Sequence, residues 1–111
     1  MKGWKTLTSI AEVDLAIEAS HQHPIVFFKH STRCSISSMA WNRIVKINED
    51  ESKTTDFYFL DLIQYRDVSN YIAEKLSVYH ESPQIIIVKN GEATLDISHL
   101  EIQPKEILDN I

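Results

Sequence analysis

The sequence predicts an α/β fold, a mixed β-sheet with helices on both faces and the element order βαβαβαββα. Three apolar runs, at 24–29, 56–62 and 84–89, are typical of strands covered on both faces. Segments with helical spacing separate these runs, and such crossovers predict parallel pairing of the early strands. The Asn90-Gly91 pair then predicts a hairpin that adds an antiparallel edge, because a type I′ turn needs positive φ at both positions.

The first third of the chain is expected to form a strand, a helix and a second strand. A short strand is predicted at Trp4–Leu7. Ser9 is typical of a helix N-cap, and Glu12 completes a capping box, so a helix is expected through Ser20. The second strand, 24–29, leads into the polar, turn-like stretch HSTRC.

The rest of the chain supplies three further helices around the later strands. A helix is predicted over 35–48, with Met39 and Trp41 at core-facing spacing, and another around 68–76. The strand at 84–89 is expected to pair with 93–98. Pro104 suits the first turn of a last helix at 105–111, which turns Ile107 and Ile111 inward.

Composition narrows the class of protein. The 111 residues suit one domain spanning 1–111, and a hydrophobic content of 43% is enough for a core. A net charge of −5 with scattered basic residues argues against a nucleic-acid partner. The single cysteine excludes an intrachain disulfide and a Cys-rich metal site. Without a membrane-length segment or signal peptide, we expect no membrane association and a cytoplasmic location.

Cys34 is the candidate nucleophile. A thiolate rather than a thiol attacks a disulfide, and an unperturbed cysteine, with a pKa of about 8.5, is only roughly 3% thiolate at pH 7. The unpaired N–H groups and dipole of the predicted helix start favour an anion at Cys34. Arg33 adds positive charge, with Lys29 and His30 as further candidates. Ser37, one turn on, is expected to donate a hydrogen bond to the Cys34 sulfur.

Plainer alternatives stay open for each of these residues. Cys34 could be a small buried apolar residue, Arg33 a solvated surface charge, and Ser37 an ordinary first-turn residue. Ser35 is a polar group expected to contact a small thiol or the thiolate, together with Ser31 and Thr32.

The chain resembles the thioredoxin superfamily over nearly its whole length. The resemblance lies in the element order, the cysteine at the second helix and the Ser-Pro pair before the strand at 84–89. The stretch KHSTRCSIS resembles the monothiol bacilliredoxins in particular. The resemblance implies that Pro83 is cis and faces Cys34, and that Ser82 pairs through its backbone with an incoming thiol or peptide. The chain departs from thioredoxins at Phe28, where they bury an acidic residue, and at Ser37, where they carry a second cysteine.

That resemblance implies a monothiol thiol–disulfide oxidoreductase. It would remove or transfer bacillithiol on client protein cysteines through a mixed disulfide on Cys34, with bacillithiol as co-substrate and no bound cofactor. Ser37 cannot form a disulfide, so a second low-molecular-weight thiol or a recycling reductase would resolve the intermediate. Two alternatives remain. One is an iron–sulfur carrier similar to Cys-x-x-Ser glutaredoxins, disfavoured by Ser35 where that family has Gly. The other is a redox-inactive adaptor.

The histidines carry weaker expectations. His21 and His23 are read as exposed loop residues, because two ligands without a third make a poor metal site, and no metal is predicted. His80 lies three residues before Pro83 and is read as a surface loop histidine. A role for His80 as a proton donor, or as a contact for carboxylates of the small thiol, is the alternative.

Overall fold

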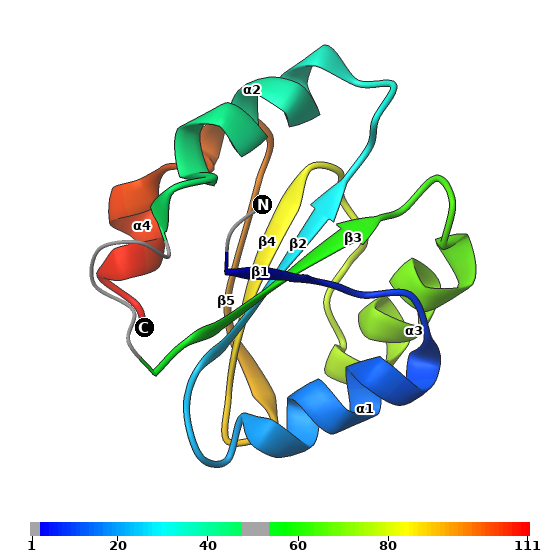
Figure 1. Ribbon diagram of the computed structural model, residues 1–111, viewed down its shortest axis with the longest axis vertical. Coiled ribbons are helices and arrows are strands. Elements are labelled where there is room, and N and C mark those ends of the chain that lie inside the picture. The colour runs from blue at the N-terminus through cyan, green and yellow to red at the C-terminus, as the bar shows by residue number, and fades with distance from the viewer. Residues whose placement is uncertain (1–2, 48–53) are drawn as a thin grey trace.

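A five-stranded mixed sheet lies between two pairs of helices (Figure 1). The computed structural model describes residues 3–47 and 54–111. The strands are β1 (Trp4–Thr6), β2 (Ile25–His30), β3 (Asp56–Asp61), β4 (Gln84–Lys89) and β5 (Glu92–Ser98). The helices are α1 (Ile10–Ala19), α2 (Ser35–Ile44), α3 (Arg66–Leu76), the 3₁₀ helix η2 (His99–Glu101) and α4 (Pro104–Leu108). The predicted α/β class and order of main elements are confirmed, and η2 was not predicted.

The sheet has the strand order β1-β3-β2-β4-β5. β3 pairs in parallel with both β1 and β2, as the crossover helices require. β4 runs antiparallel to β2, with Lys29 opposite Gln84, and also to β5. The β4–β5 turn has φ of 52° at Asn90 and 80° at Gly91, which confirms the predicted hairpin. Consequently the end of β2 and the start of β4 share one edge of the sheet.

Alternate residues of β2 face opposite layers of the core. Ile25 and Phe27 pack with α1 and α3, whereas Val26 and Phe28 pack with α2 and α4. All six residues of β2 are buried, as expected for a strand covered on both faces. The same alternation directs Lys29 toward α3 and places His30 on the α2 side.

Helix α1 begins as the sequence predicts. The Ser9 hydroxyl accepts the N–H of Glu12, and the Glu12 carboxylate accepts the N–H of Ser9, which completes the capping box. In the last helix, Ile107 is buried and Ile111 packs against the same cluster, so both face inward as predicted.

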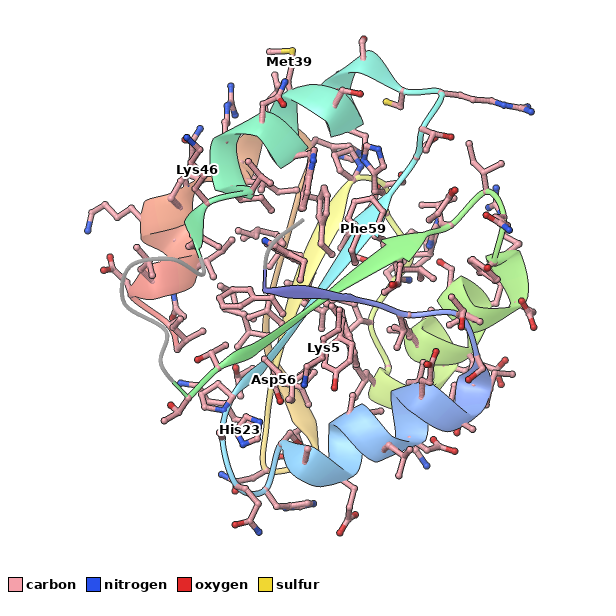
Figure 2. The ribbon with its side chains drawn as sticks, viewed as in Figure 1. Lys5, His23, Met39, Lys46, Asp56 and Phe59 are labelled. Atoms are coloured by element: carbon pink, nitrogen blue, oxygen red, sulfur yellow. The ribbon has the colours of Figure 1, made fainter. Side chains whose placement is uncertain are left out.

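Helix α2 differs from its prediction in two respects. It ends at Ile44, short of the predicted Asn48, which itself lies outside the described residues. The indole N–H of Trp4 binds the Val45 carbonyl at 3.0 Å, so a side chain meets a carbonyl at the helix end. Met39 is 48% exposed and points away from the sheet (Figure 2), so its expected core position is wrong, whereas Trp41 packs inward against Phe59.

Candidate active site at the start of helix α2

Cys34 is the N-cap residue of α2. Its backbone is extended, with φ −114° and ψ 121°, and among the described residues its side chain makes no capping hydrogen bond. The Cys34 N–H donates to the Ser31 carbonyl at 3.2 Å, and the Cys34 carbonyl accepts the Ser38 N–H at 3.1 Å. The side chain is half-buried. The sulfur therefore stands at a helix N-terminus, where the dipole and free N–H groups favour an anion.

Ser37 ties the Cys34 turn to the sheet. Its hydroxyl accepts the Ser31 N–H at 3.0 Å and lies 2.7 Å from Nδ1 of His30. The side chain is fully buried. Within the described residues it forms no hydrogen bond to the Cys34 sulfur, so the contact expected from the spacing is not made. Ser37 instead anchors the residue whose carbonyl holds Cys34.

His30 closes this network from β2. It is buried at 7% exposure, and burial lowers the pKa of its imidazole while the Asp61 carboxylate raises it less strongly. His30 is therefore neutral at pH 7 and carries no positive charge toward Cys34. When Nδ1 accepts the Ser37 proton, both hydrogen-bonding roles of that hydroxyl are used inside the protein.

Aromatic rings form the floor under this network. Phe28 stacks on Trp41 with ring centroids 5.7 Å apart, and Phe59 packs edge-on to Trp41 at 4.9 Å. His30 lies 5.2 Å from Phe59, ring to ring. Figure 2 places Phe59 between α2 and the sheet. The apolar surroundings explain why His30 loses hydration and why the Ser37 hydrogen bonds are shielded from water.

Arg33 and Ser35 flank Cys34 and are exposed. Among the described residues Arg33 forms no ion pair, so its charge is free to act at the turn through solvent. Water and salt weaken such a charge, which makes any contribution at Cys34 modest. The roles of both residues stay predictions.

The Ser82-Pro83 peptide bond is cis, as the resemblance implied. Pro83 is buried directly before β4, and the pairing of Lys29 with Gln84 brings this segment to the edge of the sheet where β2 leads toward Cys34 (Figure 1). The Ser82 hydroxyl oxygen is buried and has no hydrogen-bond partner among the described residues.

The position of Lys29 was not predicted from the sequence. Its side chain is fully buried, and its Nζ lies 3.1 Å from the Ser69 carbonyl and 3.3 Å from Nδ1 of His80. Burial lowers the pKa of Lys29 to about 8. Lys29 thus points toward α3, not toward Cys34, and His80 is half-buried against it instead of free in a surface loop. The sequence did carry a signal for this position, because Lys29 is the last residue of an apolar run expected to be covered on both faces.

His21 and His23 lie at the opposite end of the sheet. Nε2 of His23 is 2.6 Å from the Asp56 carboxylate, and Nζ of Lys5 is 3.3 Å from it (Figure 2). The expectation that His23 is exposed is wrong, whereas His21 is exposed near the β4–β5 turn. Residues 3–47 and 54–111 contain no group of three or more His, Cys, Asp or Glu suited to a metal ion.

Comparison with known proteins identifies the family. The sequence model described as monothiol bacilliredoxin BrxC matches residues 5–107. The chain belongs to the monothiol bacilliredoxin family. A solved structure described as having a thioredoxin fold is 33% identical, with a TM-score of 0.85, and the match covers 96% of this chain and 92% of that one.

Thioredoxins proper are more distant. Thioredoxin O2 of Arabidopsis thaliana shares 20% identity at a TM-score of 0.77, over 98% of this chain and 94% of that one. Mitochondrial thioredoxin 3 of Saccharomyces cerevisiae shares 19% at 0.75, over 97% and 92%. These likenesses show the thioredoxin fold, and the bacilliredoxin family together with that fold supports a thiol oxidoreductase. No helix in the described part of the chain has the length and apolarity to cross a membrane.

Proposed function

We propose that this bacilliredoxin removes bacillithiol from client protein cysteines, or transfers it, through a mixed disulfide on Cys34. The observation that carries the proposal is that Cys34, the only cysteine of the sequence, is the N-cap residue of α2 and that its sulfur makes no capping hydrogen bond among the described residues. A thiolate there gains from the helix dipole and is reachable from solvent.

The first step is a thiol–disulfide exchange. The Cys34 thiolate attacks the bacillithiol sulfur of a modified client, the client S–S bond breaks, and the client cysteine leaves as a thiolate that takes a proton from water. Cys34 then holds bacillithiol as a mixed disulfide. The number of disulfides is unchanged, so no external oxidant or reductant enters this step.

The second step needs a thiol from outside the chain. Ser37 occupies the place of a resolving cysteine and is buried in its bonds to Ser31 and His30. A second low-molecular-weight thiol or a recycling reductase therefore attacks the Cys34 mixed disulfide and regenerates the thiolate. We assign no resident cofactor to the protein, and this chemistry suits the reducing cytoplasm.

The residues around Cys34 receive distinct roles in this proposal. Arg33 supports the thiolate through its charge, and Ser35 contacts the small thiol. Ser37 acts by holding the Cys34 turn, in place of the direct bond to sulfur that the sequence suggested. The backbone of Ser82 beside Pro83 pairs with the incoming substrate.

A transfer experiment tests this function. A client protein carrying one bacillithiolated cysteine is mixed with the protein, and intact masses of both are followed. We expect the bacillithiol mass to leave the client and to be found on the protein, and Cys34→Ser to take none. A client that keeps its modification in the presence of the unmodified sequence contradicts the proposal.

A further inference from the structure

A buried polar cluster lies on the α3 side of the sheet, behind the edge that carries Cys34. It consists of Lys29 on β2, Ser69 on α3, and His80 in the loop before the cis-proline. Nζ of Lys29 contacts the Ser69 carbonyl at 3.1 Å and Nδ1 of His80 at 3.3 Å. The Ser69 hydroxyl is 3.4 Å from the same Nδ1. Nothing in the Cys34 chemistry described above uses this cluster.

The hydrogen-bond donors of the cluster determine the protonation state of His80. At pH 7 Lys29 is mostly protonated, and an ammonium group has only donors, so Nδ1 of His80 has to accept. The ring is then neutral with its proton on Nε2. Burial, the Lys29 charge and the Arg66 charge all lower the pKa of His80, against a smaller opposing effect of Glu81. A neutral ring agrees with the geometry.

We propose that Lys29 is a positioning residue that locks His80 as the Nε2–H tautomer, so that His80 presents a fixed hydrogen-bond donor to an anionic group of the small-thiol substrate. Nδ1 faces the buried amine of Lys29, and the opposite nitrogen of the ring therefore faces away from it. His80 is half-buried, whereas Lys29 is fully buried. The ring nitrogen of His80 that remains accessible, Nε2, is thus a hydrogen-bond donor.

The topology places this donor at the edge of the sheet that holds the site. Lys29 is opposite Gln84, the first residue of β4, and Pro83 directly precedes Gln84. His80 precedes Pro83 by three residues, and Cys34 follows His30 by four. Lys29 and Arg66 add positive charge around His80, which favours an anion there. That anion is a carboxylate of the small thiol or, when Cys34 is loaded from a small-molecule disulfide, the thiolate sulfur of the small thiol that leaves.

The tautomer is measurable without a variant. Nitrogen-15 chemical shifts of the histidine rings at pH 7 distinguish a protonated Nδ1 from a protonated Nε2. We expect His80 to be neutral and protonated on Nε2, and to lose this single state in Lys29→Met. A His80 ring that is charged, or protonated on Nδ1, in the unmodified sequence overturns the proposal whether or not the variant folds.

The kinetic role of His80 rests on the proposed function, and its test uses two disulfide substrates. Oxidised bacillithiol and neutral hydroxyethyl disulfide are each reacted with Cys34 at pH 7. We expect His80→Phe to slow loading by about tenfold, the effect of losing one hydrogen bond to a charged group. His80→Gln, which keeps a donor, retains most of the rate, and His21→Gln is the matched control at the far end of the sheet.

The two substrates separate the possible acceptors. Slower loading with both disulfides identifies the leaving sulfur, and slower loading with oxidised bacillithiol alone identifies a carboxylate. An unchanged rate for His80→Phe with both disulfides overturns the proposal. Failure of the unmodified sequence to load from oxidised bacillithiol counts against the proposed function instead, and the role of His80 is then decided with the neutral disulfide.

Discussion

Replacing Ser37 with alanine tests the network that holds the Cys34 turn. The substitution leaves the Ser31 N–H and Nδ1 of His30 without their partner, at positions now 3.0 Å and 2.7 Å from the hydroxyl oxygen. An unsatisfied buried polar group costs about 1–3 kcal/mol, and Ser31 is only half-buried, so we expect a loss of about 2–3 kcal/mol. With a urea slope of about 2 kcal/mol per M, the midpoint falls by about 1–1.5 M.

Urea unfolding at pH 7 measures this loss, and Ser38→Ala is the matched control. Ser38 is the next residue of α2, and its side chain is exposed. The change at Ser38 should stay within about 0.5 kcal/mol, as is usual for surface substitutions. Loading of Cys34 by a small disulfide should also slow in Ser37→Ala, because the turn is no longer tied to the sheet. Equal stability of the two variants would show that the Ser37 hydroxyl does not hold the Cys34 turn.

Four further predictions follow from other contacts. The pKa of Lys29 is about 8 in the folded state and 10.5 in the unfolded state, so the unfolded state binds more protons between pH 8 and 10.5. The free energy of unfolding, relative to that of Lys29→Met, should therefore rise by up to about 3 kcal/mol as the pH increases across this range. Urea titrations at several pH values measure this rise. Asp56→Asn removes the pairs to Lys5 and His23 and should cost about 1–2 kcal/mol, while alkylation of Cys34 at the other end of the sheet keeps its rate. Arg33→Gln should slow alkylation of Cys34 at low salt by about threefold relative to Lys46→Gln, a difference that 1 M salt removes. Trp41→Ala should cost about 3 kcal/mol, and Met39→Gln less than about 0.5, since only Trp41 packs inward.

Local patterns in the sequence were sufficient for most of the fold. The capping box at Ser9 and the Asn90-Gly91 turn are formed by residues close in the chain, and both appear as predicted. The cis bond at Pro83 came from the resemblance to a family, since the residue types alone favour trans. The start of α2 at Ser35 was predicted, whereas its end at Ile44 was not. The Val45 carbonyl just beyond that end is bound by Trp4, 41 residues away in the chain, a contact that local patterns do not reveal.

The candidate site shows the same limit. Helical spacing correctly put Ser37 one turn from Cys34, but the direction of its hydroxyl depends on His30, which the sheet brings underneath α2. The sequence suggests Lys29 as a charge near Cys34, whereas its hydrogen-bond partners Ser69 and His80 lie 40 and 51 residues away in the chain. Such contacts depend on which strands pair and in which register, and a single sequence does not show this directly.

The intact mass of the protein after exposure to oxidised bacillithiol shows whether Cys34 forms the mixed disulfide. Cys34 is the only thiol, so we expect one bacillithiol adduct on the unmodified sequence and none on Cys34→Ser. Because Ser37 cannot resolve it, this adduct should persist after the disulfide is removed and disappear only when a second thiol is added. No adduct on Cys34, or an adduct that is lost without an added thiol, would contradict the proposed monothiol mechanism.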